Sequence, residues 1–526
     1  MPDIPATDPE VEAAYVADGW WGTETLSQVV GGHAAAAPQA TALVDEHGDR
    51  MSWATYDADA DLIARSLVGT GLERGARVAV LLPDGPLLHA AFVGAERAGL
   101  VVVGIGHRAG PAEVSYLIEK TGAEAIVTTD AHAAMPGLAH HLVLRGTSTS
   151  LTVEGSDPAP DLSGRASIGP SELFLLNSTS GTTGLPKCVM QTQNRWVYFH
   201  RKAVEFGQLT PEDVFMSVVP GPFGFGLWTS HFTPTLLGAP CIVMERFSAE
   251  RMLELIEVER VTVLACVSTQ FIMALNSPDL EKRDVSSLRV MFTGGEAIPY
   301  ERALEFEERI GATLLNFYGS NETGMLSGTR TDDDRQHRLT TGGRCVAEMQ
   351  VRLFDDSGTA LPNDATRGVP GCKGPATALG YYDDEDANGK LFTDDGWMLM
   401  GDIVEINDGW LSVVGRTSDF IIRGGKNISA PAVEAEVGTH PLVKLAAVVP
   451  VPDPVFGERV ACYVEVDPGT DLTLDDIKAH LLARGVSKEW IPEHLFVTTE
   501  LPRSSGSKVA KGDLKKDAAA RIAPRP

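Results

Sequence analysis

The residues whose types and spacing most plainly suggest chemistry run from Asn177 to Lys187, a stretch of hydroxyl residues and glycines that ends in a lysine. It follows an apolar segment, Leu173–Leu176, which we expect to be a strand. Glycines let a phosphate approach the main chain, and backbone N–H groups, hydroxyls and the ammonium can all donate to its oxygens. The spacing is not GxxxxGK[ST], which excludes a Walker A loop. By composition alone the stretch fits a surface hairpin as well as a phosphate loop.

Further motifs decide between these two interpretations. Thr179–Lys187 resembles the phosphate-binding loop of the acyl-adenylate-forming superfamily, which includes acyl-CoA synthetases, nonribosomal adenylation domains and firefly luciferase. The resemblance recurs in order along the whole chain, in Gly294–Glu296, Asn316–Thr323, Gly396–Asp402, Gly415–Ile428 and Pro502–Lys508. Because accidental composition does not produce so many ordered matches, the chain is identified as a member of this superfamily.

The resemblance implies a site for ATP. Tyr318 would stack on the adenine, Asp402 would accept both ribose hydroxyls, and Arg416 would contact ribose or phosphate. An aromatic face suits a purine, and an ionised acceptor suits two neighbouring O–H donors. The full set of nucleotide-binding residues that it implies is Thr179, Ser180, Gly181, Thr182, Thr183, Gly184, Lys187, Gly295, Glu296, Ala297, Asn316, Phe317, Tyr318, Gly319, Asn321, Asp402 and Arg416.

The same resemblance implies ATP-dependent activation of a carboxylic acid as an acyl-adenylate. The acid carboxylate attacks the α-phosphate, so positive charge and fixed donors must offset two approaching anions. Glu322 would ligate Mg²⁺, because a hard carboxylate oxygen suits that ion. Lys508 would act from the C-terminal domain, and Thr179 and Lys187 would complete the catalytic set.

A thiol then takes the acyl group and AMP leaves. The resemblance implies that the small domain rotates about a hinge at Ser418 between the two steps and that Gly424, Gly425 and Lys426 contact coenzyme A. Two alternatives stay open. The acceptor could be a carrier-protein pantetheine or an amine, and the chain could be a catalytically silent ATP-binding member.

Three positions depart from the superfamily pattern. Ser418 stands where Asp or Lys is usual at the hinge, and Asn321 stands where Thr usually precedes the glutamate. An amide can still donate to phosphate. Ser507 replaces the usual Gly before the lysine, which puts the placement of Lys508 in question if that turn needs a positive φ.

The acid pocket should follow the phosphate loop. An aromatic, uncharged wall with space beside its glycine favours an apolar acid that is aryl, alicyclic or of medium chain length. The texture is closest to benzoate- and cyclohexanecarboxylate-type CoA ligases, although Pro220–Trp228 could also be ordinary packing. The residues expected to line the pocket are His200, Phe223, Gly224, Phe225, Trp228, Gly294 and Ser320.

Alternating apolar runs and amphipathic segments must position these residues. Short β-rich runs such as Arg77–Leu82 and Leu100–Ile105 flank helix-length segments such as Leu87–Ala98, the pattern of layered parallel α/β structure. Shorter strands follow after about Ala347. We therefore predict an α/β protein with a large N-terminal domain (residues 1–417) of layered α/β subdomains plus a β-rich subdomain. A small mobile α+β domain (418–526) would follow, with its end after Lys515 fraying.

Composition limits the partners. The chain of 526 residues carries a net charge of −27 with 43% hydrophobic residues. Such acidity disfavours nucleic acid and anionic lipid. The six cysteines contain no CxxC pair, and the N-terminus lacks a signal peptide, so we predict a cytoplasmic protein with no membrane partner. A homodimer stays open.

Overall fold

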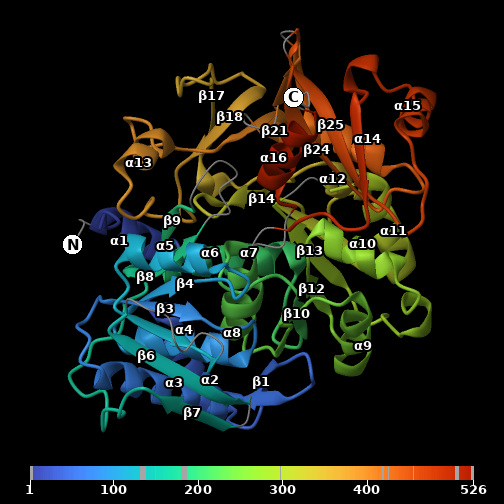
Figure 1. The fold of residues 1–526 in the computed structure, drawn as a ribbon. Coiled ribbons are helices and arrows are strands. Elements are labelled where there is room, and N and C mark those ends of the chain that lie inside the picture. Colours follow the sequence, from blue (N-terminus) through green and yellow to red (C-terminus); the bar gives the residue numbers. More distant parts are fainter. Residues whose placement is uncertain are drawn as a thin grey trace.

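The computed structural model describes residues 4–130, 138–147, 150–178, 186–295, 298–416, 420–423, 426–453, 455–503 and 509–522. Figure 1 shows two α/β layers side by side at the bottom, with the C-terminal strands and helices above them. No helix among the described residues combines the length and the apolar character needed to cross a bilayer.

The first α/β layer is built on a sheet with the strand order β7-β6-β5-β3-β4-β8-β9. Its central strands are parallel, and β7 and β9 close it antiparallel at either edge. The strands are β3 (Arg77–Leu81), β4 (Val101–Gly104), β5 (Ala125–Thr128), β6 (His140–Thr147), β7 (Ser150–Glu154), β8 (Leu173–Ser178) and β9 (Cys188–Thr192).

Helices α4 and α5 make the crossovers between these strands, as the sequence predicts. Helix α5 begins with Pro111 in its first turn and stops at Gly122, which takes a left-handed conformation with φ of 61°. Proline suits a first turn and glycine suits this cap, so both ends are set locally. The helices of this half are α1 (Pro9–Ala17), α2 (Leu26–Ala36), α3 (Trp53–Gly69), α4 (Pro86–Arg97), α5 (Pro111–Thr121) and α6 (Gln193–Gly207).

A second, larger sheet carries the middle of the chain. Strands β1, β11, β10, β12, β13 and β14 are parallel, and β2 and β15 pair antiparallel at the two ends of this run. Its strands are β1 (Thr41–Val44), β2 (Arg50–Ser52), β10 (Phe215–Ser217), β11 (Cys241–Val243), β12 (Val263–Ala265), β13 (Val290–Gly294), β14 (Thr313–Ser320) and β15 (Gly324–Gly328). Its helical segments are α7 (Gly224–Gly226), a π-helix (Leu227–Phe232), α8 (Thr233–Leu237), α9 (Ala249–Glu259), α10 (Ser268–Asn276) and α11 (Tyr300–Ile310).

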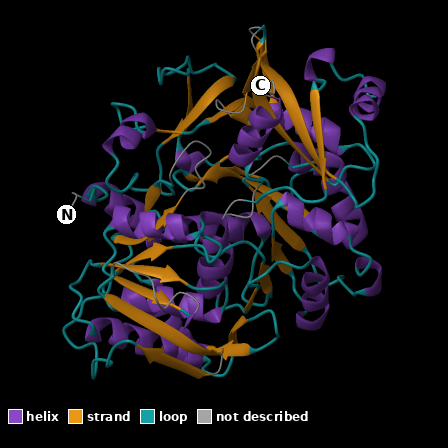
Figure 2. Ribbon diagram, viewed as in Figure 1, coloured by secondary structure: helices purple, strands orange, loops and turns teal. Residues whose placement is uncertain are grey.

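Short antiparallel strands then extend this sheet, as the change of texture after Ala347 predicts. They are β16 (Arg344–Cys345), β17 (Val351–Phe354), β18 (Arg367–Cys372), β19 (Met398–Leu399), β20 (Asp402–Asn407) and β21 (Trp410–Arg416), with helices α12 (Arg335–Thr340) and α13 (Glu385–Leu391). Figure 2 shows the strands of this part and of the C-terminal part at the top of the molecule.

The C-terminal part has its own sheet with the order β23-β22-β25-β24, and β26 pairs with β25. Its elements are β22 (Phe420–Arg423), β23 (Lys426–Ser429), α14 (Ala430–Gly438), β24 (Leu445–Asp453), β25 (Gly457–Glu465), α15 (Leu474–Ala483), β26 (His494–Thr498) and α16 (Lys511–Ile522). Separate apolar clusters include α14 and α15 in one case and α16 in the other. The predicted boundary at 417/418 falls among residues outside the described ranges and stays a prediction.

The prediction that the end of the chain frays is wrong for α16. This helix buries Leu514 and Ala518, and Tyr463 donates a hydrogen bond to Asp517 at 2.6 Å. The many alanines and lysines of α16 suggested a solvated helix, but its short apolar stripe packs on β24 and β25. The C-terminal part also touches the large part, where Ser429 donates to the carbonyl of Val414 at 2.9 Å.

Candidate active site

The carboxyl ends of strands from the two large sheets meet at one place. Strand β8 ends at Ser178, just before the predicted phosphate loop, and β14 ends at Ser320, just before the predicted metal ligand. Asn177 and Asn321 join these ends, because each side-chain amide donates to the other's oxygen at 3.1 and 2.8 Å. Open α/β sheets bind ligands at the carboxyl ends of their strands. The predicted site therefore lies where this fold places ligands.

The Glu322 side chain is held by a tyrosine that sequence reasoning missed. Tyr381 donates from its hydroxyl to Glu322 Oε1 at 2.7 Å, and the ammonium of Lys187 lies 4.6 Å from the centre of the Tyr381 ring. Burial, followed by the nearby Glu322 carboxylate, raises the pKa of Tyr381 and keeps its hydroxyl protonated. Tyr381 thus links two predicted catalytic residues, one just before β9 and the other in the turn between β14 and β15.

Tyr318 and Asp402 also come together. The Tyr318 hydroxyl donates to Asp402 Oδ2 at 2.9 Å, and both residues are buried. A Cβ at Gly319 would lie 1.7 Å from the carbonyl oxygen of Gly324, so this position of β14 needs glycine. Strand alternation puts Phe317 on the other face, where its ring packs at 5.7 Å on Trp228. The side chain of Phe317 therefore belongs to the core, and its predicted contact with nucleotide stays a prediction.

The residues predicted to form the acid wall differ in exposure, because Trp228 is buried while Phe223, Gly224 and Phe225 are partly exposed. Trp228 is 3% exposed and stacks on Phe199 at 4.8 Å and on Phe225 at 5.8 Å. Phe223, Gly224 and Phe225 are partly exposed, as is His200. Trp228 is therefore packed among aromatic rings, and its place in the acid wall stays a prediction. It begins the second turn of a helical segment that widens to π geometry over residues 227–232, a feature frequent at functional sites.

The other predicted site residues fall into two groups, those with contacts in the structure and those outside the described ranges. Gly294 is buried at the end of β13, Ser320 accepts from Glu322 N at 3.2 Å, and Asn316 donates its side-chain amide to the Thr341 carbonyl at 2.9 Å. Thr179, Ser180, Gly181, Thr182, Thr183, Gly184, Glu296, Ala297, Ser418, Gly424, Gly425 and Lys508 lie outside the described residues, as do the side chains of Arg416 and Lys426. Gly295 is exposed beside Glu296. The roles of these residues stay predictions.

The Glu322 carboxylate could bind a magnesium ion that is also bound to the phosphates of a nucleotide. Among the described residues, no group of three or more His, Cys, Asp and Glu side chains could hold a metal. Mg²⁺ keeps several waters and is commonly held by one or two carboxylates together with substrate phosphates. Glu322, which is partly exposed and held by Tyr381, fits that demand.

Beneath the site lies a buried arginine that the sequence did not single out. Arg195, near the start of α6, is 1% exposed and donates to the carbonyl oxygens of Ala376 at 2.7 Å, Asn321 at 2.8 Å and Glu322 at 3.2 Å. Burial lowers the pKa of its guanidinium to about 9, so it stays charged at neutral pH. A basic residue before an aromatic run is the only sequence signal for it.

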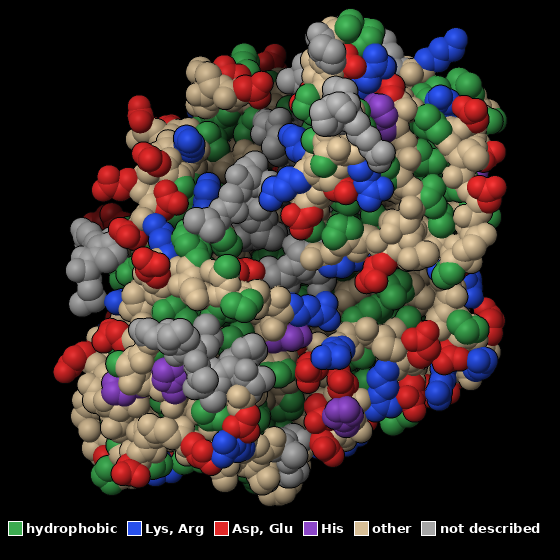
Figure 3. Space-filling view, viewed as in Figure 1, with side chains coloured by type: hydrophobic (Ala, Val, Ile, Leu, Met, Phe, Trp, Pro, Cys, Tyr) green, Lys and Arg blue, Asp and Glu red, His purple; other side chains and the backbone are tan. Residues whose placement is uncertain are grey.

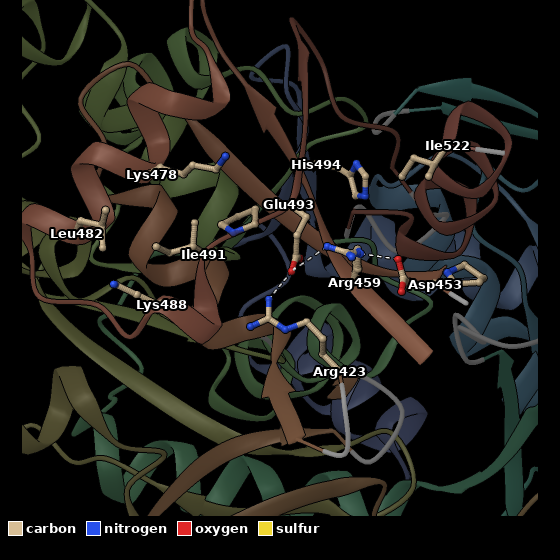
Figure 4. A pocket seen from close by; sticks show the side chains of 12 residues that line it. Arg423, Asp453, Arg459, Lys478, Leu482, Lys488, Ile491, Glu493, His494 and Ile522 are labelled. Atoms are coloured by element: carbon tan, nitrogen blue, oxygen red, sulfur yellow. Dashed lines mark hydrogen bonds and ion pairs between the residues drawn. The ribbon is translucent and has the colours of Figure 1, made fainter. Parts of the chain in front are cut away.

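The C-terminal domain carries an open groove of about 720 Å³ lined by both charges. Figure 4 shows Arg423 and Arg459 converging on Glu493, with Asp453 on the far side of Arg459. Arg459 lies 2.5 Å from Asp453 and 4.0 Å from Glu493. Figure 3 shows the same mixture of Asp, Glu, Lys and Arg over the face of the molecule in view.

Comparison with known proteins agrees with this arrangement. The model of the AMP-binding enzyme family matches residues 32–382, and that of the AMP-binding enzyme C-terminal domain matches residues 432–508. The chain is similar to medium-chain fatty-acid–CoA ligase of Escherichia coli, with 29% identity over 97% of this chain and 93% of that protein. It is also similar to a salicylyl-CoA synthase / salicylate adenylyltransferase of a Streptomyces species, with 31% identity over 96% of each chain.

A solved structure shares the fold. The anthranilate CoA ligase AuaEII in complex with anthranoyl-AMP has a TM-score of 0.84 to this chain at 22% identity, over 95% of this chain and 98% of that one. The similarity spans both the large and the small domain. The large N-terminal part and the small C-terminal part predicted from the sequence are therefore the architecture of a known class of protein.

Proposed function

The chain belongs to the AMP-binding enzyme family, and from this premise we propose that it activates a carboxylic acid with ATP as an acyl-adenylate and then transfers the acyl group to coenzyme A, releasing AMP. The observation that carries the proposal is the chain of contacts from Lys187 through Tyr381 to Glu322. It supports the proposal because it brings a cation and a carboxylate together next to the end of β8, where we expect the phosphates of ATP.

Electrostatics favours this reaction at this site. The acid and the α-phosphate are both anions, so the barrier falls when fixed donors and positive charge are already in place. Lys187 supplies one charge, and Lys508 would bring a second from the C-terminal domain. Bound Mg²⁺ would neutralise the phosphates, with Glu322 as its protein ligand. Tyr318 and Asp402, already hydrogen-bonded to each other, offer an aromatic ring and a carboxylate for adenosine.

We propose an apolar acid as the substrate, either aryl, alicyclic or of medium chain length. The partly exposed Phe223 and Phe225, with Gly224 between them, form a wall without charge. Relatives with this architecture are named for a fatty acid and for salicylate. Both names fit an apolar pocket, and the choice between aryl and aliphatic acids is left to experiment.

We further propose a cytoplasmic location and a rotation of the C-terminal domain between the two half-reactions. The six cysteines carry free thiols, five of them buried, which suits a reducing compartment. Rotation about Ser418 would withdraw Lys508 and bring Gly424, Gly425 and Lys426 to the thiol. A homodimer is compatible with this scheme, and gel filtration would decide it.

A pyrophosphate-release screen across aryl, alicyclic and fatty acids, with and without coenzyme A, tests the proposal. We expect acid-dependent pyrophosphate release, and AMP release that needs free coenzyme A. The acceptor would be a carrier-protein pantetheine or an amine if coenzyme A has no effect on AMP release and one of those two groups takes the acyl group instead. The Lys508→Ala variant should lower adenylation on the order of 100-fold. Unchanged pyrophosphate exchange in that variant would contradict the assignment of Lys508.

A further inference from the structure

The most unusual charge in the large domain is Arg195. It forms no ion pair with an Asp or Glu carboxylate in the part of the chain that the structure describes, although the charge of Glu322 favours its ionised form, and its guanidinium carbon lies 4.8 Å from the centre of the Trp196 ring. Burying a guanidinium without a carboxylate is costly unless every donor is satisfied. Its contacts must therefore be strong enough to offset that cost.

Those contacts all go to one small region. Arg195 donates to the backbone carbonyls of Asn321 and Glu322, to the carbonyl of Ala376, and to the side chain of Gln191 on β9, just before α6. The two carbonyls belong to the turn after β14 that presents the Glu322 carboxylate. A planar guanidinium with several fixed donors can hold such carbonyls in one orientation.

A network of side-chain amides extends this hold to the phosphate loop. Gln191 donates to Asn177 Oδ1 at 2.9 Å and to Asn321 Oδ1 at 3.2 Å. Asn177 and Asn321 donate to each other, and Asn177 stands two residues before Thr179. The amide of Asn321 therefore ties β8 to the turn after β14, and its contact with phosphate stays a prediction.

The network also touches the acid wall. Asn177 donates to the carbonyl of Pro222 at 3.3 Å, and a Cβ added to Gly224 would lie 2.8 Å from Asn321 Oδ1. One largely buried polar network therefore joins the end of β8, which precedes the phosphate loop, to the Glu322 turn and the acid wall. Buried networks of this kind rigidify their surroundings when all members are satisfied.

We propose that Arg195 is a positioning residue for adenylation, holding the Glu322 turn in register with the phosphate loop and the acid wall through Gln191, Asn177 and Asn321. This inference rests on the proposed function. It assigns the effect of Arg195 to the first half-reaction, because the acyl-adenylate, once formed, no longer needs the pyrophosphate-binding groups. Arg195 touches no substrate itself and acts through the Asn321 and Glu322 backbone.

Arg195→Lys tests this, because one ammonium keeps the charge but cannot reach all the acceptors at once. We expect kcat for pyrophosphate exchange to fall on the order of 100-fold. Binding of α,β-methylene-ATP with Mg²⁺, measured by thermal shift, should weaken. The reaction of supplied acyl-adenylate with coenzyme A should change by less than about threefold, because its groups stay in place. Gln191→Leu should show the same pattern more weakly.

Arg338→Lys is the matched control. Arg338 is also a buried arginine of the large domain, but it pairs with Glu307 and donates to Leu314, away from the site. Its variant should lose stability while leaving the ratio of the two half-reactions unchanged. Equal losses in both half-reactions for Arg195→Lys, or no loss in either, would overturn the proposal. A wild-type protein without any acid-dependent exchange would instead remove the proposed function.

Discussion

The same residue type is used in opposite ways in the two domains. In the large domain, Arg195 is 1% exposed and donates to neutral oxygens. In the C-terminal domain, the Arg423 and Arg459 side chains are 18% and 32% exposed and pair with the carboxylates of Glu493 and Asp453. Arg423 and Arg459 are each neutralised by a neighbouring carboxylate, whereas Arg195 keeps a positive charge beneath the turn where anionic substrates are expected.

This difference has an energetic consequence. Pairs that water can reach typically contribute about 0–1 kcal/mol, since solvent replaces either partner. A buried group whose partners are removed leaves donors or acceptors that water cannot satisfy, which costs about 1–3 kcal/mol for each. The geometry of the large domain should therefore depend on Arg195 far more than that of the small domain depends on its groove.

The largest expected effect comes from breaking each region with the same substitution. Arg195→Met leaves the carbonyls of Ala376, Asn321 and Glu322 without their donor and should lower the free energy of unfolding by about 4 kcal/mol. Arg423→Met, the matched variant in the groove, should lower it by less than about 1 kcal/mol. Urea denaturation followed by tryptophan fluorescence would measure both. Similar losses in the two variants would contradict the contrast between the domains.

The second-largest effect should be a loss of stability on acidification that is greater in the large domain than in the C-terminal domain. His89 and His231 are buried in the large domain with their Nδ1 atoms 3.0 Å apart. Burial lowers the pKa of His89 to about 4, and burial with the neighbouring His89 lowers that of His231 well below its usual value. The native state holds both rings neutral while the unfolded state binds protons near pH 6.5. Stability is therefore full above that pH and is lost as the pH falls toward 4.

We expect His89 alone to contribute a loss of about 3 kcal/mol between pH 7 and pH 4. Burial also lowers the pKa values of His480 and His494 in the C-terminal domain, but both rings are partly exposed, so the loss there should be smaller. Melting temperatures recorded across this range would follow the loss. Replacing His89 and His231 together by Asn, which keeps polar atoms near Nδ1 but does not titrate, should flatten the pH dependence. An unchanged slope would show that other groups cause it.

The hydroxyl of Tyr381 should have a smaller effect, confined to adenylation. Tyr381→Phe removes the hydrogen bond to Glu322 Oε1 but keeps the ring beside Lys187. A hydrogen bond to a charged group contributes about 1.5 kcal/mol or more, so pyrophosphate exchange should fall by about tenfold. Tyr463→Phe, which removes a hydrogen bond to Asp517 in the C-terminal domain, is the control and should leave exchange unchanged. Equal rates for the two variants would show that Tyr381 does not orient Glu322.

How far the sequence could lead depended on whether a feature is local. The crossover helix from Pro111 to Thr121 was predictable because its proline and glycine caps lie within the segment itself. The motif residues Tyr318, Glu322 and Asp402 could also be predicted, because they belong to the motifs that carry the resemblance. Their pairing with partners 59 to 84 residues away, Tyr381 and Asp402, was not.

Burial was harder still to foresee. Arg195 lies in the first turn of α6, which begins Gln193-Asn194, and nothing in that polar start indicates that all of it is enclosed. Asn321 was expected at the phosphate because it stands where the superfamily usually has Thr, and its amide can still donate. Its partner Asn177 lies 144 residues earlier, so only the packing of β8 against the turn after β14 reveals the contact.

The smallest effect should come from Gly224, where the network meets the acid wall. Gly224→Ala places a methyl group 2.8 Å from Asn321 Oδ1 and 3.2 Å from Trp196, so one of the two must shift slightly. A shift of this kind costs about 1 kcal/mol, which corresponds to a fewfold rise in KM for the acid. Because the methyl group takes up space beside the acid wall, the rise in KM should be larger for a bulky aryl acid than for a short aliphatic one. The ratio of kcat/KM values for benzoate and hexanoate measures the difference, with Gly389→Ala, on the exposed side of α13, as the control. If both acids lose equally while exchange rates fall, the added methyl group acts on the Asn321 network, and the wall itself does not select the acid.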